Sequence, residues 1–259
     1  MKHLDYLEIL DLFCWGLDKL ARPTLHNLLM GYEEYPHYGN GRRVIHRMRQ
    51  QQLLRQSQEG REPVYSITAK GRERLRVIHP PNRWNQKWDG AWRVVAFDIP
   101  ERQRKNRKRL WRALHANKLG HLQRSVWIWP HDVTEKLSRI IQIGGFPECF
   151  CGFKATELFL CTEHEIVNIA WNWREIRHRH QHYLQCLVAE SSSLHKARDL
   201  TSLAKLARIE RKAYDDAFDL DPLLPRQLLP KGYAGFGVQQ RHDDFRAVLK
   251  QKTTKFIVG

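Results

Sequence analysis

Residues 92–114 read "WRVVAFDIPERQRKNRKRLWRAL", and this stretch decides the fold class of the middle of the chain. Its apolar beginning predicts a strand that ends at Asp98, and its later part has helical spacing with Leu110 and Leu114 on one side. Seven lysines or arginines follow the proline, mostly on or near the other side of that helix. Two interpretations are open: a nuclease whose metal ligand is Asp98, or a structural domain of a protein that binds DNA elsewhere.

The segments after this helix predict the rest of a small α+β domain over residues 90–165. The stretch "LQRSVWIWP", residues 122–130, alternates as a strand does, and Asp132 or Thr134 can cap a short helix up to Ile143. The stretches "ECFCGF" and "TELFLCT" predict two more strands. The predicted order is strand, helix, strand, helix, strand, strand, which indicates a ferredoxin-like domain.

The first part of the chain, residues 1–80, has the pattern of a winged helix-turn-helix DNA-binding domain. Two amphipathic helices are predicted first, and a third, "GRRVIHRMRQQQ", turns Val44, Ile45 and Met48 inward. Its other side and the flanks of that side carry our candidates for DNA contact: Arg42, Arg43, His46, Arg47, Arg49 and Gln50. Arg and Gln side chains pair with guanine and adenine edges, so this helix suits the major groove.

Two short strands, residues 53–56 and 64–67, follow the third helix around a turn at Gly60 and complete the winged order. Arg61 lies at the predicted tip of this wing, where it is expected over a phosphate. The competing interpretation is a generic helical bundle with a solvated basic face, which explains the charges but not the hairpin. Residues 79–90 contain two prolines and a glycine and are predicted to be a linker.

The charge of the whole chain favours a polyanionic partner. The formal net charge is +16, the isoelectric point is about 9.9, and each third of the chain has more Lys and Arg than Asp and Glu. A broad basic surface fits a long polyanion better than a single anchor point, although excess cations also keep proteins soluble. We therefore expect double-stranded DNA as the partner.

Several other classes of protein and site are disfavoured. Acidic residues among the first twenty positions argue against a signal peptide, and no apolar run reaches the roughly 18 residues of a membrane span, so we expect a cytoplasmic protein. Five cysteines without a paired framework indicate reduced thiols. Cys149 and Cys151 are too close for a zinc site, and Glu175, His178 and His182 more often form a polar helix face. We expect no metal and no cofactor.

Four stretches of the chain resemble the phenylacetate-repressor (PaaX) family. The run from Trp92 to Glu101, with "SVWIWP" at residues 125–130, resembles the middle domain of the family, which is similar to the small nuclease-like subunit of the CRISPR adaptation machinery. Two stretches in the predicted C-terminal helical domain, residues 166–259, follow: "WNWREIRHRHQHYL" and the most specific one, "ERKAYDDAFDLDPLLPRQLLPKGYAG". The departures are a longer, Tyr-rich turn before the third helix and residues 118–120.

The resemblance implies a dimeric transcriptional repressor that an acyl-coenzyme A releases from DNA, with phenylacetyl-coenzyme A the best known effector. It does not indicate which residues bind the effector. A homodimer on a palindromic operator is also expected because one winged helix reads too few base pairs. A DNA-binding subunit or scaffold without a ligand response is a further alternative.

In the nuclease-like proteins an Asp at the end of the first strand is the proposed metal ligand, which implies Asp98 here. Hard cations need several oxygens, and nothing in the sequence fixes Glu101 or Asp132 beside Asp98. We therefore expect Asp98 to be structural, with its side chain accepting backbone N–H bonds before Pro100, and the chain not to be an enzyme. A metal-dependent nuclease of the CRISPR-adaptation type is the alternative function.

Overall fold

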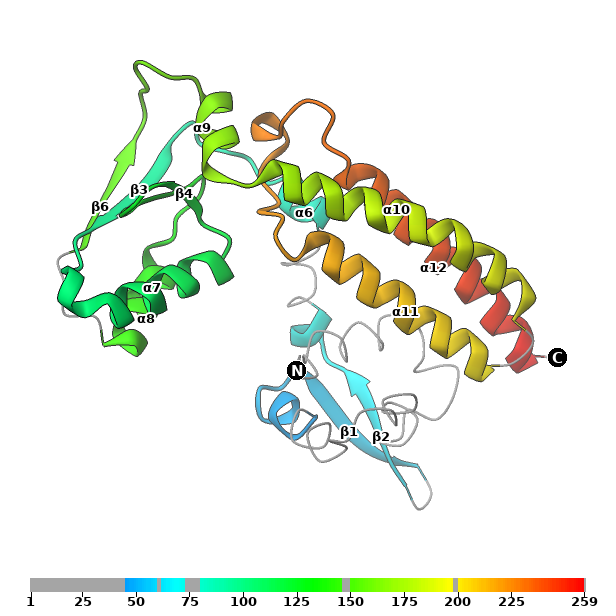
Figure 1. The fold of residues 1–259 in the computed structure, drawn as a ribbon. Helices are drawn as coiled ribbons and strands as arrows, with labels where there is room; N and C mark the ends of the chain where they lie inside the picture. The colour runs from blue at the N-terminus through cyan, green and yellow to red at the C-terminus, as the bar shows by residue number, and fades with distance from the viewer. Residues whose placement is uncertain (1–44, 60–61, 73–79, 146–149, 198–199, 259) are drawn as a thin grey trace. The chain divides into compact units, whose positions relative to one another are not determined.

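The computed structural model describes residues 45–59, 62–72, 80–145, 150–197 and 200–258 (Figure 1). Internal contacts divide the chain into two compact units. The first unit comprises Met1–Asn82, Leu184–Tyr214 and Gln239–Gly259, and the second comprises Arg83–Tyr183 and Asp215–Val238. Among the described residues, no helix combines the length and the apolar character that crossing a membrane requires.

The centre of the second unit is a four-stranded antiparallel sheet with two helices. Its elements are β3 (Trp92–Phe97), η2 (Glu101–Gln103), α7 (Arg104–Ala116), β4 (Gly120–Gln123), β5 (Val126–Trp129), α8 (Thr134–Gly144) and β6 (Phe150–Ala155). The strand order across the sheet is β4-β5-β3-β6, and each neighbouring pair is antiparallel. This is the interleaved arrangement of a ferredoxin-like domain, so the α+β class is confirmed.

One face of this sheet carries α7, which lies beside α8 (Figure 1). Val95 of β3 and Trp127 of β5 are register partners, and both are buried. Leu110 and Leu114 of α7 are 0% and 1% exposed, and the Trp111 ring meets the Trp127 ring edge-on at 6.2 Å between centroids. Aliphatic and aromatic packing therefore holds α7 on the sheet.

The segment that precedes Pro130 forms two strands rather than the single strand that its alternation predicts. β4 and β5 are joined by a two-residue turn at Arg124 and Ser125, with a register shift between His121 and Gln123. Neither turn residue is Gly, Asn or Pro, so the hairpin lacks the usual sequence signal. The observed order is strand, helix, strand, strand, helix, strand.

Residues 156–162 do not form the last strand predicted from "TELFLCT". They have no regular secondary structure, and Leu160 has a left-handed backbone conformation (φ 69°) that a strand excludes. Phe159 and Leu160 are exposed, so their apolar character does not reflect a buried strand. β3 already pairs with β5 on one side and β6 on the other. That prediction is therefore wrong.

α9 (Glu163–Ala170) follows this irregular segment and begins at a capping box formed by Thr162 and Glu165. The chain then packs back on β4. A Cβ added to Gly120 would lie 2.7 Å from the Trp171 ring, and Trp171 Nε1 donates to the Lys118 carbonyl at 3.0 Å. Gly120 is therefore needed for this close approach.

The predicted linker, residues 79–90, contains a short helix. This helix, α6 (Pro80–Trp84), ends at Trp84, which is 3% exposed. The Trp84 ring contacts three further aromatic rings of the second unit: Phe218, Tyr233 and Phe236. A linker prediction based on Pro and Gly misses this burial because the contacts come from residues more than a hundred positions later.

The first unit combines a helix and hairpin with parts of three long helices. Residues 45–50 are helical, and β1 (Leu54–Glu59) pairs with β2 (Glu62–Ile67) in an antiparallel hairpin. The long helices, each shared between the units, are α10 (Trp173–Lys196), α11 (Leu200–Phe218) and α12 (Gly235–Val258); η3 (Arg226–Leu228) lies between the last two. In the first unit His242 of α12 lies 2.7 Å from Glu210 of α11, and both are buried.

Candidate nucleic-acid interface

The helix of residues 45–50 ends at a defined position. Gln52 takes a left-handed backbone conformation (φ 60°), and its N–H donates to the Arg49 carbonyl at 2.9 Å. The Leu53 N–H donates to the Met48 carbonyl, also at 2.9 Å, which completes a Schellman motif. Because Met48 and Leu53 are both buried, this motif fixes the direction in which the chain enters β1.

Thr68 ties the end of the hairpin to the end of this helix. Its hydroxyl donates to the Gln52 carbonyl at 2.6 Å, and its N–H donates to the Leu53 carbonyl at 3.0 Å. The same hydroxyl accepts from the Gly71 N–H at 3.0 Å and so caps the helical residues 69–72. The end of the helix is therefore connected both to the start of β1 and to the residue that follows β2.

Four of the predicted DNA-binding residues lie on the exposed side of the helix: His46, Arg47, Arg49 and Gln50. Ile45 and Met48 are buried, 2% and 0% exposed. The Gln50 amide nitrogen lies 3.1 Å from His46 Nε2, and within the described residues neither arginine pairs with an acidic side chain. The two guanidinium groups are available to a partner, and their chemistry suits base edges and phosphates.

The other three predicted contact residues, Arg42, Arg43 and Arg61, lie outside the described residues. The prediction does not include Arg55 of β1, an exposed cation opposite Ser66 in the hairpin register. Arg55 directly follows the buried Leu53 and Leu54, and a charged residue after an apolar pair is a sequence signal for an exposed cation at this position.

Asp98 and Asp132 lie at opposite ends of the sheet. Asp98 follows β3 at the end where the Phe97 N–H donates to the Ser125 carbonyl at 3.2 Å. Asp132 follows β5, which is antiparallel to β3 and therefore ends beside the other end of β3. A strand of six residues spans roughly 17 Å, so the two carboxylates do not share one metal ion.

The carboxylate of Glu101 is also engaged elsewhere, since it pairs with Arg107 at 2.7 Å. In the part of the chain that the structure describes, no three His, Cys, Asp or Glu side chains are grouped to hold a metal ion. Asp98 is exposed, and no hydrogen bond within the described residues reaches its side chain. The expectation of backbone N–H bonds to Asp98 is therefore wrong: Pro100, two residues on, has no N–H to donate.

α10 presents Glu175, His178 and His182 without forming a metal site from them. Glu175 Oε1 accepts from Arg179 Nε at 3.1 Å, and Arg179 also donates to Asp219 at 3.3 Å. His178 is exposed. These contacts tie α10 to the end of α11, as expected of a polar helix face.

A buried polar junction forms around Asp221. Its Oδ2 accepts from the Tyr233 hydroxyl at 2.5 Å, and its Oδ1 accepts from the Leu223 N–H at 2.7 Å. His180 Nε2 lies 3.1 Å from Oδ2, at ion-pair distance but outside hydrogen-bond geometry. Asp221 and His180 are 0% and 1% exposed. One carboxylate therefore connects α10, the Asp221-Pro222 segment and the turn before α12.

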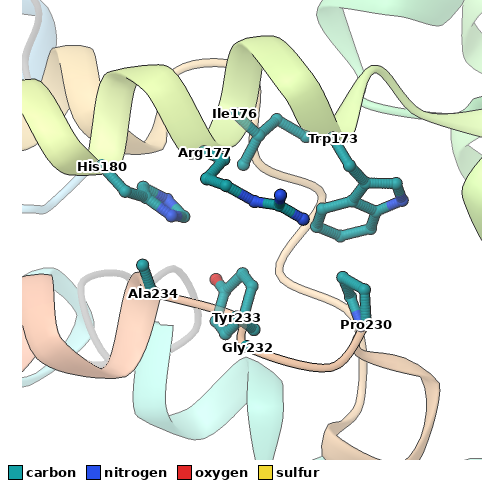
Figure 2. A pocket seen from close by; sticks show the side chains of 8 residues that line it. All are labelled: Trp173, Ile176, Arg177, His180, Pro230, Gly232, Tyr233 and Ala234. Carbon is teal, nitrogen blue, oxygen red and sulfur yellow. The ribbon is translucent and has the colours of Figure 1, made fainter.

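Figure 2 shows a small cavity beside this junction, between α10 and the turn that precedes α12. The Trp173, Tyr233 and His180 rings line it together with Arg177. Its volume of about 10 Å³ is close to the room that one water molecule needs. A Cβ added to Gly235 would overlap the Tyr233 ring, so Gly235 leaves the room that this ring needs. In this conformation the cavity has no room for an acyl chain.

The domain that contains the four-stranded sheet matches a known protein family. Residues 85–167 match the family model described as the PaaX protein central Cas2-like domain, which confirms the resemblance over the domain that carries β3 to β6. The chain is similar in fold to a solved structure described as uncharacterized protein Rv0674 from Mycobacterium tuberculosis. The identity is 17%, the TM-score 0.50, and 88% of each chain is covered. No curated protein shows a significant match.

Proposed function

We propose that this chain, whose residues 85–167 carry the central domain of the PaaX family, is a cytoplasmic transcriptional repressor that binds double-stranded DNA in a sequence-specific manner. The observation that carries the proposal is the exposed side of helix 45–50, where Arg and Gln side chains lie opposite the buried Ile45 and Met48. A hairpin follows this helix directly, which is the order of a winged helix-turn-helix.

The proposal assigns a role to each of three parts of the chain. Residues 1–80 form the winged helix-turn-helix, residues 90–165 the ferredoxin-like domain and residues 166–259 the C-terminal helical domain. DNA contacts are assigned to the residues expected from the sequence: Arg42, Arg43, His46, Arg47, Arg49, Gln50 and Arg61. Two copies of the chain related by a twofold axis read a palindromic operator, because one helix covers too few base pairs for genomic specificity.

The proposed effector is an acyl-coenzyme A that releases the repressor from DNA. An effector of this kind must bind the DNA-free conformation more tightly than the DNA-bound one. The support is the presence of the PaaX domain and the basic character of the chain, which suits the phosphates of coenzyme A. Because the cavity of Figure 2 holds about one water molecule, it does not supply the acyl site without a change of shape.

The alternative function, a metal-dependent nuclease that uses Asp98, has less support. Asp98 lies at the opposite end of the sheet from Asp132, and Glu101 pairs with Arg107. A single carboxylate is a weak ligand set for a hard divalent cation.

The decisive experiment is selection of bound sequences from a random duplex library, followed by affinity measurements on the selected site. Arg47→Ala is expected to weaken specific binding by ~1–3 kcal/mol if Arg47 pairs with a base, and mainly to reduce the salt dependence if it meets a phosphate. The matched control is Arg241→Ala, which removes an exposed arginine from α12. Recovery of no preferred sequence, or unchanged affinity in an Arg43→Ala and Arg47→Ala double variant, contradicts the proposal.

A further inference from the structure

α7 carries more positive charge than its packing uses. Arg107 pairs with Glu101 at 2.7 Å, and Arg109 donates to the Gly144 carbonyl at the end of α8 at 3.2 Å. Both contacts hold α7 in its domain. Four other cations of the helix are exposed and, within the described residues, pair with no acidic side chain; they are named the α7 stripe: Arg104, Lys105, Lys108 and Arg112.

The α7 stripe occupies one side of the helix. At about 100° of rotation per residue, its four side chains fall within a sector of about 100°. Leu110 and Leu114 are buried on the other side, against the sheet. Trp111, which is 41% exposed, borders the sector, and the exposed His115 lies within it. The free charges of α7 are therefore gathered into one band that faces outward.

This arrangement is unfavourable for the helix itself. α7 contains no acidic residue, and its first turn carries Arg104 and Lys105, where the helix dipole favours negative charge. Arg104 with Lys108, and Lys108 with Arg112, are like-charged pairs four residues apart, which destabilise a helix. Local rules broken without a compensating contact are typical of functional surfaces.

We propose that the α7 stripe binds the phosphate backbone of double-stranded DNA. This inference rests on the proposed function and adds to it a contact that is independent of sequence. The α7 stripe fits such a partner because its cations face one way at helical spacing, and because a chain with a net charge of +16 attracts a polyanion. Phosphate contacts set affinity and register, not base preference, so the α7 stripe strengthens binding to any duplex.

The test compares two full-length variants with the same change in charge. The stripe variant carries Lys105→Gln, Lys108→Gln and Arg112→Gln, because Gln retains helix propensity. The control variant replaces three exposed cations of α11 and α12 with Gln: Lys205→Gln, Lys212→Gln and Arg241→Gln. Affinity is measured over a range of salt concentrations for a random-sequence duplex and for a duplex selected by the wild-type protein. Circular dichroism checks that each variant folds.

For the stripe variant we expect affinity for both duplexes to fall about tenfold or more, with sequence preference unchanged. The plot of log K against log salt concentration has a negative slope, and its magnitude should decrease by about 2–3, since each lost phosphate contact removes about 0.9. An equal loss in the control variant, or an unchanged slope in the stripe variant, overturns the inference. A preference of the wild-type protein for single-stranded DNA that the stripe variant loses also overturns it.

These results separate the two proposals. Wild-type protein that binds no duplex contradicts the proposed function and this inference together. If the wild type and the stripe variant both bind DNA sequence-specifically, and the slope of log K against log salt concentration is the same for both, this inference alone is contradicted. An Arg47→Ala variant that loses sequence preference but keeps the wild-type slope of log K against log salt concentration supports separate roles for the two helices. Helix 45–50 then recognises bases, and α7 binds phosphates.

Discussion

The helices α7 and α9 begin in opposite electrostatic ways. α9 starts at the Thr162–Glu165 capping box and has Glu163 and Glu165 in its first turn, where the helix dipole favours them. The hydrogen bonds from Thr162 hold the pKa of Glu165 below its usual value. α7 starts at Gln103 without a side-chain cap and has cations in its first turn.

This difference separates charges that stabilise a fold from charges that a fold tolerates. The acidic residues of α9 serve the helix that contains them. α7 depends instead on Leu110 and Leu114 against the sheet, and the α7 stripe adds no ion pair within the described residues. Charges that lower the stability of their own helix therefore indicate a partner more strongly than charges that also serve the fold.

The largest expected effect tests whether packing holds α7 in place. Leu114→Ala should lower the free energy of unfolding by ~2–5 kcal/mol, because it leaves a cavity at a side chain that is 1% exposed. Urea unfolding measures this loss. Arg112→Ala, on the opposite side of the same turn, should change stability by less than about 0.5 kcal/mol. Similar losses in the two variants contradict the division between the two sides.

The next effect tests the beginning of α9. Thr162→Ala should lower the free energy of unfolding by about 1 kcal/mol, because the Glu165 N–H loses its acceptor and the box opens. Thr162→Ser keeps the hydroxyl and should keep most of the stability. Thermal unfolding followed by circular dichroism distinguishes the variants, and equal melting temperatures for Thr162→Ala and the wild type argue against a stabilising cap.

Charge reversal in the two first turns should act with opposite signs. Arg104→Glu is expected to raise the free energy of unfolding by ~0.3–1 kcal/mol at low salt, and Glu163→Arg to lower it by a similar amount. Both shifts should shrink at high salt, where exposed charges are screened. Shifts of the same sign in the two helices would show that the first-turn charges of α7 and α9 do not affect the free energy of unfolding in opposite ways.

The smallest effect is expected at Asp98, the carboxylate that precedes α7. No hydrogen bond within the described residues reaches its side chain, so Asp98→Asn should change stability by less than about 0.5 kcal/mol. DNA affinity should also stay close to that of the wild type. Incubation of DNA with Mg²⁺ or Mn²⁺ provides the opposing result: cleavage by the wild type that Asp98→Asn abolishes would establish the nuclease alternative.

The sequence predictions that hold rest on side chains a few residues apart. The strand that ends at Asp98, the inward Leu110 and Leu114 and the inward Ile45 and Met48 all follow from local periodicity. Local periodicity does not show which cations of α7 have a partner within the fold, since the partner of Arg109 lies 35 residues away. The sequence therefore identifies a basic helix, and the fold decides which of its charges are free.

The two strand predictions that fail do so where the backbone turns without a clear sequence signal. Among the residues that the structure describes, four that are not glycine have left-handed conformations that Gly or Asn usually adopts: Gln52, Lys118, Leu160 and Leu223. The Arg124-Ser125 turn that separates β4 from β5 contains no Gly, Asn or Pro, so alternation alone predicts one strand. Residues 156–162 contain the apolar but exposed Phe159 and Leu160, and composition does not distinguish this segment from a strand.

The junction at Asp221 affects how similar chains are recognised in genomes. The residues around it form the most specific part of the resemblance, and they meet inside the second unit: the Asp221 carboxylate contacts the Tyr233 hydroxyl, the Leu223 N–H and the His180 ring. Chains found through this stretch are therefore expected to join their C-terminal helices in the same way. They can still differ at every residue that reads DNA, so the operator of each has to be determined separately.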